Sequence, residues 1–323
     1  MTTVVLTARR VPKTGAPLSE CEDATSPLPE QSGPRSLPAE GLAVAVADGA
    51  TTYSYSQEWA NIICTEQARQ PLTDANDLMT RLPDWQAAWQ QEVQERVAEM
   101  SWFAAAKAEQ GAFSTFLQLA LLPDGTWRAL AIGDSCLVQF RKGKPVHRDG
   151  EYPFFPLHTS ESFAEKPYLL PTRMDLNPRV TEHIRETHGK WRPGDEFLLM
   201  TDALAAWFIQ EFEQQRFAQD QLRAFYTSAA EADAQPSAET PASQQEVTVL
   251  DPRLILDTYL SRYRPISPSG ASALTGVDLL TPAPIDLDAT FQNWVEETKM
   301  SGLLKDDDVS FVHVALKEEG VHA

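Results

Sequence analysis

Short apolar segments recur along the chain, each rich in Val, Leu, Ala or Phe and bounded by turn residues. Segments of this length and composition are typical of β-strands. The expected strands cover residues 2–8, 42–47, 114–122, 126–132, 136–141, 196–200 and 309–316. The turn sequence Pro123-Asp124-Gly125 separates two of them, so the strands on either side of it are expected to form an antiparallel hairpin.

Two longer segments, residues 56–70 and 84–110, have apolar side chains at the three- and four-residue spacing of amphipathic helices. The apolar stripe of the second segment consists of Trp85, Trp89, Val93, Val97 and Met100. Large side chains at this spacing indicate contact with a hydrophobic core rather than with a cofactor. A further helix is expected in the sequence ALAAWFIQEF, which follows Asp202 directly.

Two segments show neither the pattern expected of a strand nor the three- and four-residue spacing of a helix. Residues 26–41 contain many Pro, Ser and Gly and are expected to form an irregular excursion on the surface. Residues 151–172 are rich in Pro and Phe and are predicted to form an ordered loop or flap. Loops of this kind often border active sites.

The later part of the chain contains polar, compositionally biased sequence. Residues 228–247 are rich in Ala, Glu, Gln, Ser and Pro and are expected to be mobile, and residues 265–284 form a second irregular connection. We therefore expect a single domain over residues 1–323, with a variable insertion at about 210–285.

Composition narrows the class of partner. Of the 323 residues, 42% are hydrophobic, which is enough for a sizeable core. The 27 Lys and Arg against 46 Asp and Glu give a formal charge of −19. A charge of this sign argues against nucleic acid or an anionic membrane surface as the partner, and it fits metal chemistry better.

Cysteine usage and hydropathy indicate the compartment. Cys21, Cys64 and Cys136 lack the paired spacing of metal ligands, and their odd number favours reduced thiols. The first residues lack the basic stretch and apolar core of a signal peptide, and no apolar run reaches membrane-spanning length. We expect a soluble, cytoplasmic protein with no membrane partner.

Aspartates stand at the ends of four expected strands: Asp48 ends LAVAVAD, Asp134 ends ALAIGD, Asp202 follows EFLLMT, and Asp307 precedes VSFVHV. An ionised carboxylate at the edge of an apolar core needs a hydrogen bond, a counter-ion or a metal ion. Each of them alone is more often a turn former, and the sequence does not show whether the strand ends meet. An all-oxygen donor set without a His or Cys cluster favours Mg²⁺ or Mn²⁺ over zinc.

Five segments resemble, in order, the signature blocks of type 2C (PPM-type) serine/threonine protein phosphatases: ECEDA at 20–24, VADGA at 46–50, IGDS at 132–135, LLMTDALA at 198–205 and DDDVSFV at 306–312. The element WFAAAKAEQGAFSTFL, the flap and the ending FQNWVEETKMSGLLKDDDVSF are similar to a bacterial branch of the family. The resemblance covers most of the chain, except roughly residues 210–285. It implies an α+β fold, a four-layer αββα sandwich of two antiparallel sheets flanked by helices, with the active site in a cleft at one end.

The resemblance also implies roles for the matching residues. Asp48 would bridge two divalent cations, and the Gly49 carbonyl would bind one of them. Asp202 and Asp307 would complete the first metal site, so Asp48, Asp202 and Asp307 are the predicted catalytic residues. Asp307 is selected from the acidic run 306–308 by this alignment alone.

The remaining predicted ligands belong to a second and a third cation. Glu22 and Asp23 would serve the second metal directly or through water molecules. Asp134 would share a third, weaker cation with Asp202.

The implied activity is hydrolysis of phosphoserine and phosphothreonine in proteins by a metal-activated water, with Mn²⁺ or Mg²⁺ as cofactor. The expected partners are a phosphorylated protein substrate and a cognate kinase system, and no nucleic acid. Two alternatives stay open. One is a non-catalytic phosphoprotein-binding or regulatory domain on the same fold, and the other is a phosphatase of small molecules.

The sequence departs from the family pattern in two places. Thr51 and Thr52 stand where many relatives have glycines, and Ala50 where some have a proton-donating histidine. Residues 17–19 lack the arginine with which relatives commonly bind phosphate. The candidates to replace it are Arg9, Arg10 and Lys13. For each of them, the alternative is that the side chain is an ordinary solvated charge near a strand end and does not bind phosphate.

Overall fold

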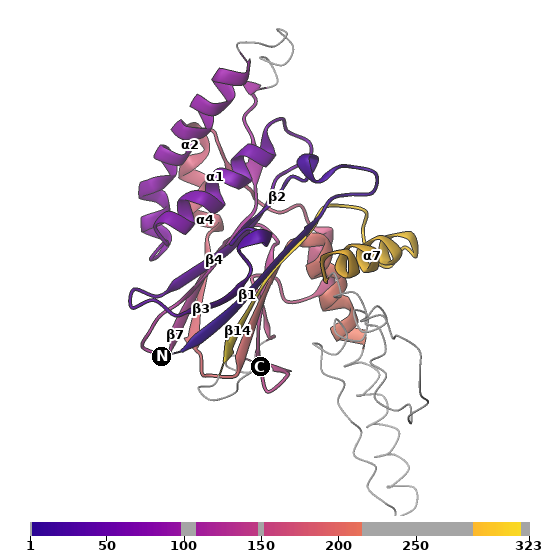
Figure 1. Cartoon of the computed structure of the whole chain (residues 1–323). Helices are drawn as coiled ribbons and strands as arrows, with labels where there is room; N and C mark the ends of the chain where they lie inside the picture. Colours follow the sequence, from indigo (N-terminus) through magenta and orange to yellow (C-terminus); the bar gives the residue numbers. More distant parts are fainter. Residues whose placement is uncertain (1, 98–107, 148–151, 215–286, 318–323) are drawn as a thin grey trace, which may run out of the picture.

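The computed structural model describes residues 2–97, 108–147, 152–214 and 287–317. Within them, two antiparallel sheets pack face to face and helices cover both outer sides (Figure 1). The α+β class and the four-layer arrangement are therefore confirmed. None of the described helices is both long enough and apolar enough to cross a membrane.

The first sheet has the strand order β10-β8-β13-β14-β1-β3, with β9 paired to β8. Its strands are β1 (Thr3–Val11), β3 (Gly33–Ser36), β8 (Cys136–Arg141), β9 (Lys144–Pro145), β10 (Phe154–Phe155), β13 (Asp195–Met200) and β14 (Val309–Lys317). The long first and last strands of the chain, β1 and β14, lie side by side at its centre.

The second sheet has the order β12-β7-β6-β4-β2. Its strands are β2 (Asp23–Ser26), β4 (Leu42–Asp48), β6 (Phe116–Leu121), β7 (Thr126–Ile132) and β12 (Arg185–Lys190). The predicted hairpin is confirmed, because β6 and β7 pair antiparallel around the turn at 123–125. A separate pair of short strands, β5 (Phe113–Ser114) and β11 (Leu170–Pro171), lies beside this sheet.

Helices form the outer layers. The α-helices are α1 (Ser56–Arg69), α2 (Ala75–Val97), α4 (Asn177–His183), α7 (Leu287–Met300) and one over 202–214. Short 3₁₀ turns are η1 (Leu18–Glu20), η2 (Pro29–Gln31), η3 (Ser160–Ala164) and η4 (Met174–Leu176). In Figure 1, α1 and α2 lie on the side of β4 and β7, and α7 lies on the other side of the molecule.

Three apolar clusters fill the three spaces between the four layers. Trp127, Phe197 and Val314 belong to the cluster between the sheets. Trp59 and Trp85 anchor α1 and α2 on the second sheet. The helices on the first sheet are held by a cluster that includes Trp207, Phe208, Phe291 and Trp294. Each large side chain buried in this way contributes about 1.5–3 kcal/mol to folding.

The expected irregular excursion over residues 26–41 is wrong in part. Residues 29–31 form η2, and β3 pairs with β1 from Thr3↔Ser36 to Leu6↔Gly33. Proline is tolerated in β3 because this is an edge strand of its sheet, where a backbone N–H can be missing without the loss of a hydrogen bond between strands.

The expected start of the second helix at Asp84 is also wrong. Helix α2 begins at Ala75 and continues through Pro83. Asp74 caps the helix, because its Oδ1 accepts a hydrogen bond of 2.9 Å from the Asp77 amide. The predicted end of this helix at residue 110 falls partly on residues 98–107, outside the described residues. So do the segments 228–247 and 265–284 and the insertion beyond residue 214.

Candidate active site

The predicted site residues lie where the two sheets meet at one end of the sandwich. Asp23 begins β2, Asp48 ends β4, and the two residues are direct cross-strand partners. From the other sheet, Thr201 Oγ1 donates a hydrogen bond of 2.9 Å to Asp23 Oδ2, and this bond joins the two sheets. The convergence of strand ends, which the sequence left open, is therefore present in the fold.

The carboxylates are close enough to act on one another. Burial raises the pKa of Asp48 well above its ordinary value, and the charges of Asp23, Asp202, Asp134 and Asp307 raise it further. Each of these groups thus makes ionisation of Asp48 more costly. A set of mutually repelling carboxylates at the edge of a core requires positive charge.

Two other members of the cluster have raised pKa values for the same reason. Burial raises the pKa of Asp23, and the nearby Asp308 and Asp202 add to the effect. Burial, followed by the charge of Asp202, raises the pKa of Asp134 to about 7. Lys305 opposes the shift of Asp134.

Lys305 is a cation that the sequence analysis did not identify. Its Nζ lies 3.0 Å from Asp202 Oδ2 and 2.8 Å from Asp307 Oδ2, so one ammonium bridges the two carboxylates predicted to share a metal. Burial lowers the pKa of Lys305, but the two carboxylates outweigh burial and raise it. The signal in the sequence was a lysine in the loop that leads into the acidic run.

The three aspartates of that run have different partners. Asp308 is 4% exposed, and its two oxygens accept hydrogen bonds from the backbone amides of Lys13 (2.8 Å) and Glu22 (2.6 Å). Asp306 accepts a bond of 2.9 Å from the Thr14 amide. Asp307 instead reaches Lys305 beside Asp202, which favours it over its neighbours as the predicted ligand.

Glu22 and Gly49 lie beside this cluster. Glu22 Oε2 is 3.3 Å from Lys13 Nζ. The Gly49 amide donates a bond of 3.2 Å to the Glu22 carbonyl. A Cβ on Gly49 would lie 2.8 Å from the backbone of both Glu22 and Ser56, so no side chain fits at this position.

Two of the candidate phosphate-binding cations also lie near the cluster. Although burial lowers the pKa of Lys13, Glu22 and the aspartates 307 and 308 raise it above its usual value. Arg10 Nη1 donates a bond of 3.0 Å to the Asp23 carbonyl. Arg9 instead donates to the carbonyl of the preceding residue, Ala8.

The donor set fits a hard divalent cation. No three His, Cys, Asp or Glu side chains in the described ranges form a ready-made metal site. However, Asp23 Oδ1 is buried and makes no hydrogen bond of ordinary geometry, although the Ser310 hydroxyl lies near enough to lower the pKa of Asp23. A cation would satisfy such an oxygen beside other carboxylates. The donors are oxygens, as Mg²⁺ and Mn²⁺ prefer.

A groove of about 590 Å³ adjoins Asp134. The segment 156–168 forms one wall, with Lys166 and Tyr168, and the other wall carries His183 and Arg185. The Tyr168 and His183 rings stack with centroids 3.9 Å apart. The flap predicted over 151–172 therefore borders the carboxylate cluster within its described part.

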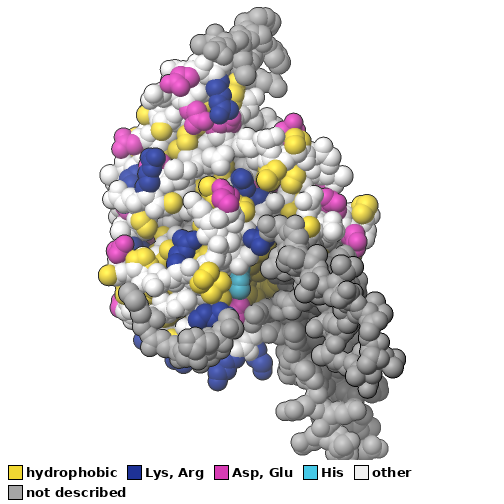
Figure 2. Space-filling view, in the orientation of Figure 1, with side chains coloured by type: hydrophobic (Ala, Val, Ile, Leu, Met, Phe, Trp, Pro, Cys, Tyr) yellow, Lys and Arg dark blue, Asp and Glu magenta, His cyan; other side chains and the backbone are white. Residues whose placement is uncertain are grey.

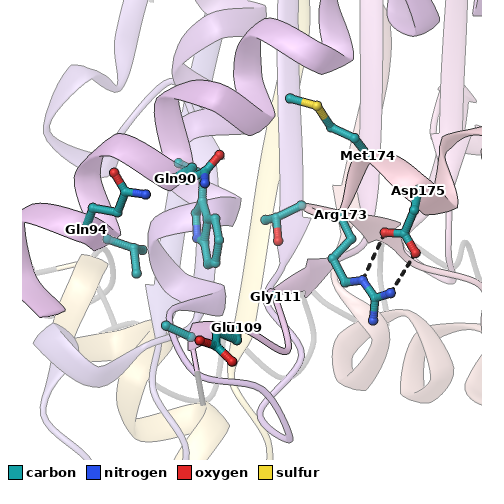
Figure 3. Close-up of a pocket in the computed structure, with 11 residues that line it drawn as sticks. Gln90, Gln94, Glu109, Gly111, Arg173, Met174 and Asp175 are labelled. Carbon is teal, nitrogen blue, oxygen red and sulfur yellow. Dashed lines mark hydrogen bonds and ion pairs between the residues drawn. The ribbon is translucent and has the colours of Figure 1, made fainter. Parts of the chain in front are cut away.

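A second hollow, of about 540 Å³, lies between α2 and the segment 172–175 (Figure 3). Gln90 and Gln94 reach it from the helix, and the ion pair between Arg173 and Asp175 lies at its other side. None of the predicted ligands lines this hollow. We assign it no part in the site.

Comparison with known proteins agrees with this fold. A family model described as protein phosphatase 2C matches residues 19–243, which is more than half of the chain. The chain therefore belongs to the protein phosphatase 2C family. A search of curated proteins gives no match.

Several solved structures are similar at low identity. The catalytic domain of the serine/threonine protein phosphatase PstP, in complex with two manganese ions, is 14% identical over 98% of this chain and 100% of that one, with a TM-score of 0.48. PppA of Pseudomonas aeruginosa is 18% identical over 97% of both chains, with a TM-score of 0.44. RsbX in complex with magnesium is 12% identical over 98% and 100%, with a TM-score of 0.42. At these scores the likenesses add nothing to the family match.

Proposed function

We propose that this chain hydrolyses phosphoserine and phosphothreonine in proteins with the help of two Mn²⁺ or Mg²⁺ ions. The observation that carries the proposal is the convergence of Asp23, Asp48, Asp134, Asp202 and Asp307 at one end of the sandwich. Family membership gives this cluster a known type of chemistry, and the orphan oxygen of Asp23 gives it a need for cations.

The residues divide between the ions as the family pattern implies. Asp48, Asp202 and Asp307, with the Gly49 carbonyl, would hold the first ion. Asp48 would also hold the second, served by Glu22 and Asp23. Ions held by these residues would supply a water of lowered pKa, which would attack phosphorus as the serine or threonine oxygen leaves.

The other residues of the site position these ligands. Thr201 holds Asp23 from the opposite sheet, and Thr115 Oγ1 accepts a hydrogen bond of 2.9 Å from the Asp48 amide. Ser114 Oγ donates to the Asp48 carbonyl at 2.8 Å. Asp308 fixes the segment that carries Glu22. Ligands held this firmly need little rearrangement to bind a cation.

The groove beside Asp134 supplies charge for the substrate. Lys166 and Arg185 line it beside Glu165 and Asp134, in a protein whose formal charge is −19 and which would otherwise repel a phosphate dianion. We infer that a phosphopeptide lies along this groove with its phosphate toward the aspartates. Selection of the substrate would then depend on residues 156–168 of the flap.

A non-catalytic binding domain is the second candidate. The observation that favours it is the sequence Ala50-Thr51-Thr52, which lacks the glycines and the histidine of many relatives. A phosphatase of small molecules is the third, because chemistry at phosphorus does not select the leaving group.

The test is hydrolysis of a phosphothreonine peptide and of para-nitrophenyl phosphate, each with Mn²⁺, Mg²⁺ or EDTA. The wild type is compared with Asp202→Asn and with Asp124→Asn, which removes a charge from an exposed turn. We expect metal-dependent release of phosphate from both substrates, lost in Asp202→Asn and kept in Asp124→Asn. No release with any cation would favour the binding domain, and release from para-nitrophenyl phosphate alone would favour a small-molecule substrate.

A further inference from the structure

Lys and Arg side chains gather at the end of the molecule opposite the aspartates. Figure 2 shows dark-blue side chains toward its lower end, away from α2. The strand ends and turns there carry Arg128, Arg141, Lys142, Lys144, Lys190 and Arg192. A local excess of positive charge is unexpected in a chain with a formal charge of −19.

Arg128 has no counter-ion among the residues that the structure describes. It is half-buried, its Nε is inaccessible, and that atom has no hydrogen-bond partner in the described part of the chain. Arg141, by contrast, makes an ion pair of 2.7 Å with the buried Asp195. An inaccessible guanidinium nitrogen without a partner is costly. Because no ligand can reach Nε, a ligand would bind the exposed part of the same side chain.

The strand pairing shows where Arg128 points. Its neighbours Trp127 and Ala129 pack between the sheets, whereas Leu130 packs under the helices. Because side chains alternate along a strand, Arg128 lies on the outer face of the second sheet. On the adjacent strand His188 is its direct partner, and Lys190 lies one pair further along the same face.

Two adjoining grooves pass over this face. One, of about 790 Å³, is lined by Thr126, Arg128, His188 and Lys190. The other, of about 470 Å³, extends from Arg128 to the connection between α1 and α2 at 72–74. Arg128 and His188 line both grooves, so the two join at this pair of residues.

The acidic residues of the grooves already have partners. Glu186 Oε1 accepts a bond of 2.6 Å from the Ala75 amide at the start of α2. Asp74 caps the same helix through the Asp77 amide. Lys190, like Arg128, has no ion pair with any described residue. Glu186 and Asp74 also line these grooves, but backbone amides of α2 hold them, and neither makes an ion pair with Arg128 or Lys190 in the described part of the chain.

Strand β12 also offers backbone groups to a ligand. It pairs with β7 along one side and has no strand on its other side within the described ranges. Its far end is closed, because the Lys190 carbonyl accepts bonds from Gln139 and Arg141. Residues 185–189 remain as an edge on which an extended peptide can add as a further strand.

We propose that this surface, formed by Arg128, His188, Lys190 and the edge of β12, binds an extended acidic segment of a partner protein. In an added strand every second side chain faces outward, with about 6.6 Å between them. Carboxylates at alternate positions would then lie over the Arg128 and Lys190 side of the sheet. Arg128 and Lys190 lie toward the end of the sheet away from the aspartate cluster, whereas the edge itself begins at Arg185, which also lines the groove beside Asp134.

The test uses the full chain and fluorescence anisotropy of a labelled peptide with alternating Glu and Val. The matched probe has Gln in place of Glu. We expect salt-sensitive binding of the Glu peptide, binding of the Gln peptide at least about tenfold weaker, and a similar loss for Arg128→Gln. Arg69→Gln, which removes an equal charge from exposed α1, should bind as the wild type does.

Several results would overturn the proposal. They are equal binding of the two peptides, no binding of either, or full binding by Arg128→Gln. If a labelled oligo-dT binds through Arg128 more tightly than the peptide does, the partner is a nucleic acid and the proposed protein partner is wrong. If Arg128→Gln does not fold, as judged by circular dichroism, Lys190→Gln must show the loss instead. Turnover of para-nitrophenyl phosphate should be the same in both variants, which separates this proposal from the phosphatase activity.

Discussion

Lys305 Nζ lies 3.0 Å from Asp202 Oδ2, the carboxylate that begins the helix after β13, and the same ammonium lies 2.8 Å from Asp307 Oδ2. The two aspartates come from different strands of one sheet and are separated by about a third of the chain. A lysine that is 61% exposed on its side chain therefore places its charge where the predicted first metal would bind. The lysine and a cation at this position would compete for the same oxygens.

This competition predicts the behaviour of Lys305→Met. Without the ammonium, Asp202 and Asp307 repel each other, so the metal-free protein should lose up to about 1 kcal/mol of stability, the usual limit for an exposed ion pair. Mn²⁺ no longer displaces a bound cation, so its affinity should rise several-fold. Thermal unfolding with EDTA and calorimetric titration with Mn²⁺ measure the two effects.

The control for this variant is Lys144→Met, an exposed lysine in β9 at the opposite end of the molecule. It should change neither quantity. Weaker Mn²⁺ binding by Lys305→Met would show that the lysine supports the metal site instead of competing with it.

Asp48→Asn should abolish metal-dependent turnover while stabilising the metal-free protein. Asp48 is surrounded by four other carboxylates that raise its pKa, and the neutral amide removes that repulsion. A gain of about 1 kcal/mol corresponds to a rise of about 2–4 °C in the melting temperature. Differential scanning calorimetry in EDTA measures it, and a lower melting temperature would show that Asp48 has a stabilising partner.

Thr201→Val should destabilise the fold by about 1–3 kcal/mol. The hydroxyl is completely buried, donates to Asp23 Oδ2 and accepts a bond of 2.9 Å from the Ser310 amide, so valine leaves both groups unpaired. Thr201→Ser keeps the hydroxyl and should retain most of the stability. Equal urea midpoints for the two variants would show that the Thr201 hydroxyl does not stabilise the fold.

Asp308→Ala should cost about 2–4 kcal/mol, because two backbone amides lose a charged acceptor. Asp306→Ala, at a side chain that is 58% exposed, should cost less than about 1 kcal/mol. Urea unfolding of the two variants therefore distinguishes an aspartate that stabilises the fold from a neighbour that contributes little. Similar costs for both variants would contradict the roles inferred from their hydrogen bonds.

Local pattern was sufficient to predict most of the central strands. Strands β6, β7 and β8 lie within about two residues of their expected bounds because they are short, apolar and separated by clear turns. Strand β12 was not predicted, because its sequence RETHGK is polar and exposed and its pairing with β7 is a long-range property. The start of α2 was missed because the helix continues through Pro83, a residue type that more often stands at a helix boundary than inside one.

The candidate site was predicted as a set of residues but not as an arrangement. The aspartates at strand ends could be read from the sequence, and family resemblance gave them roles. Neither showed that Thr201 reaches Asp23 across the sheets or that Lys305 bridges Asp202 and Asp307. The first contact depends on how two sheets pack together, and the second on how two strands far apart in the sequence pair in one sheet. Local sequence encodes neither.

The central claim is that the aspartate cluster is a centre for divalent cations, and calorimetric titration with Mn²⁺ tests it most directly. The wild type should bind two ions, and Asp48→Asn, which removes the carboxylate proposed to hold both, should lose both while remaining folded in EDTA. If the wild type binds no Mn²⁺, or if Asp48→Asn binds it as the wild type does, the cluster is not the metal centre and the proposed mechanism is wrong.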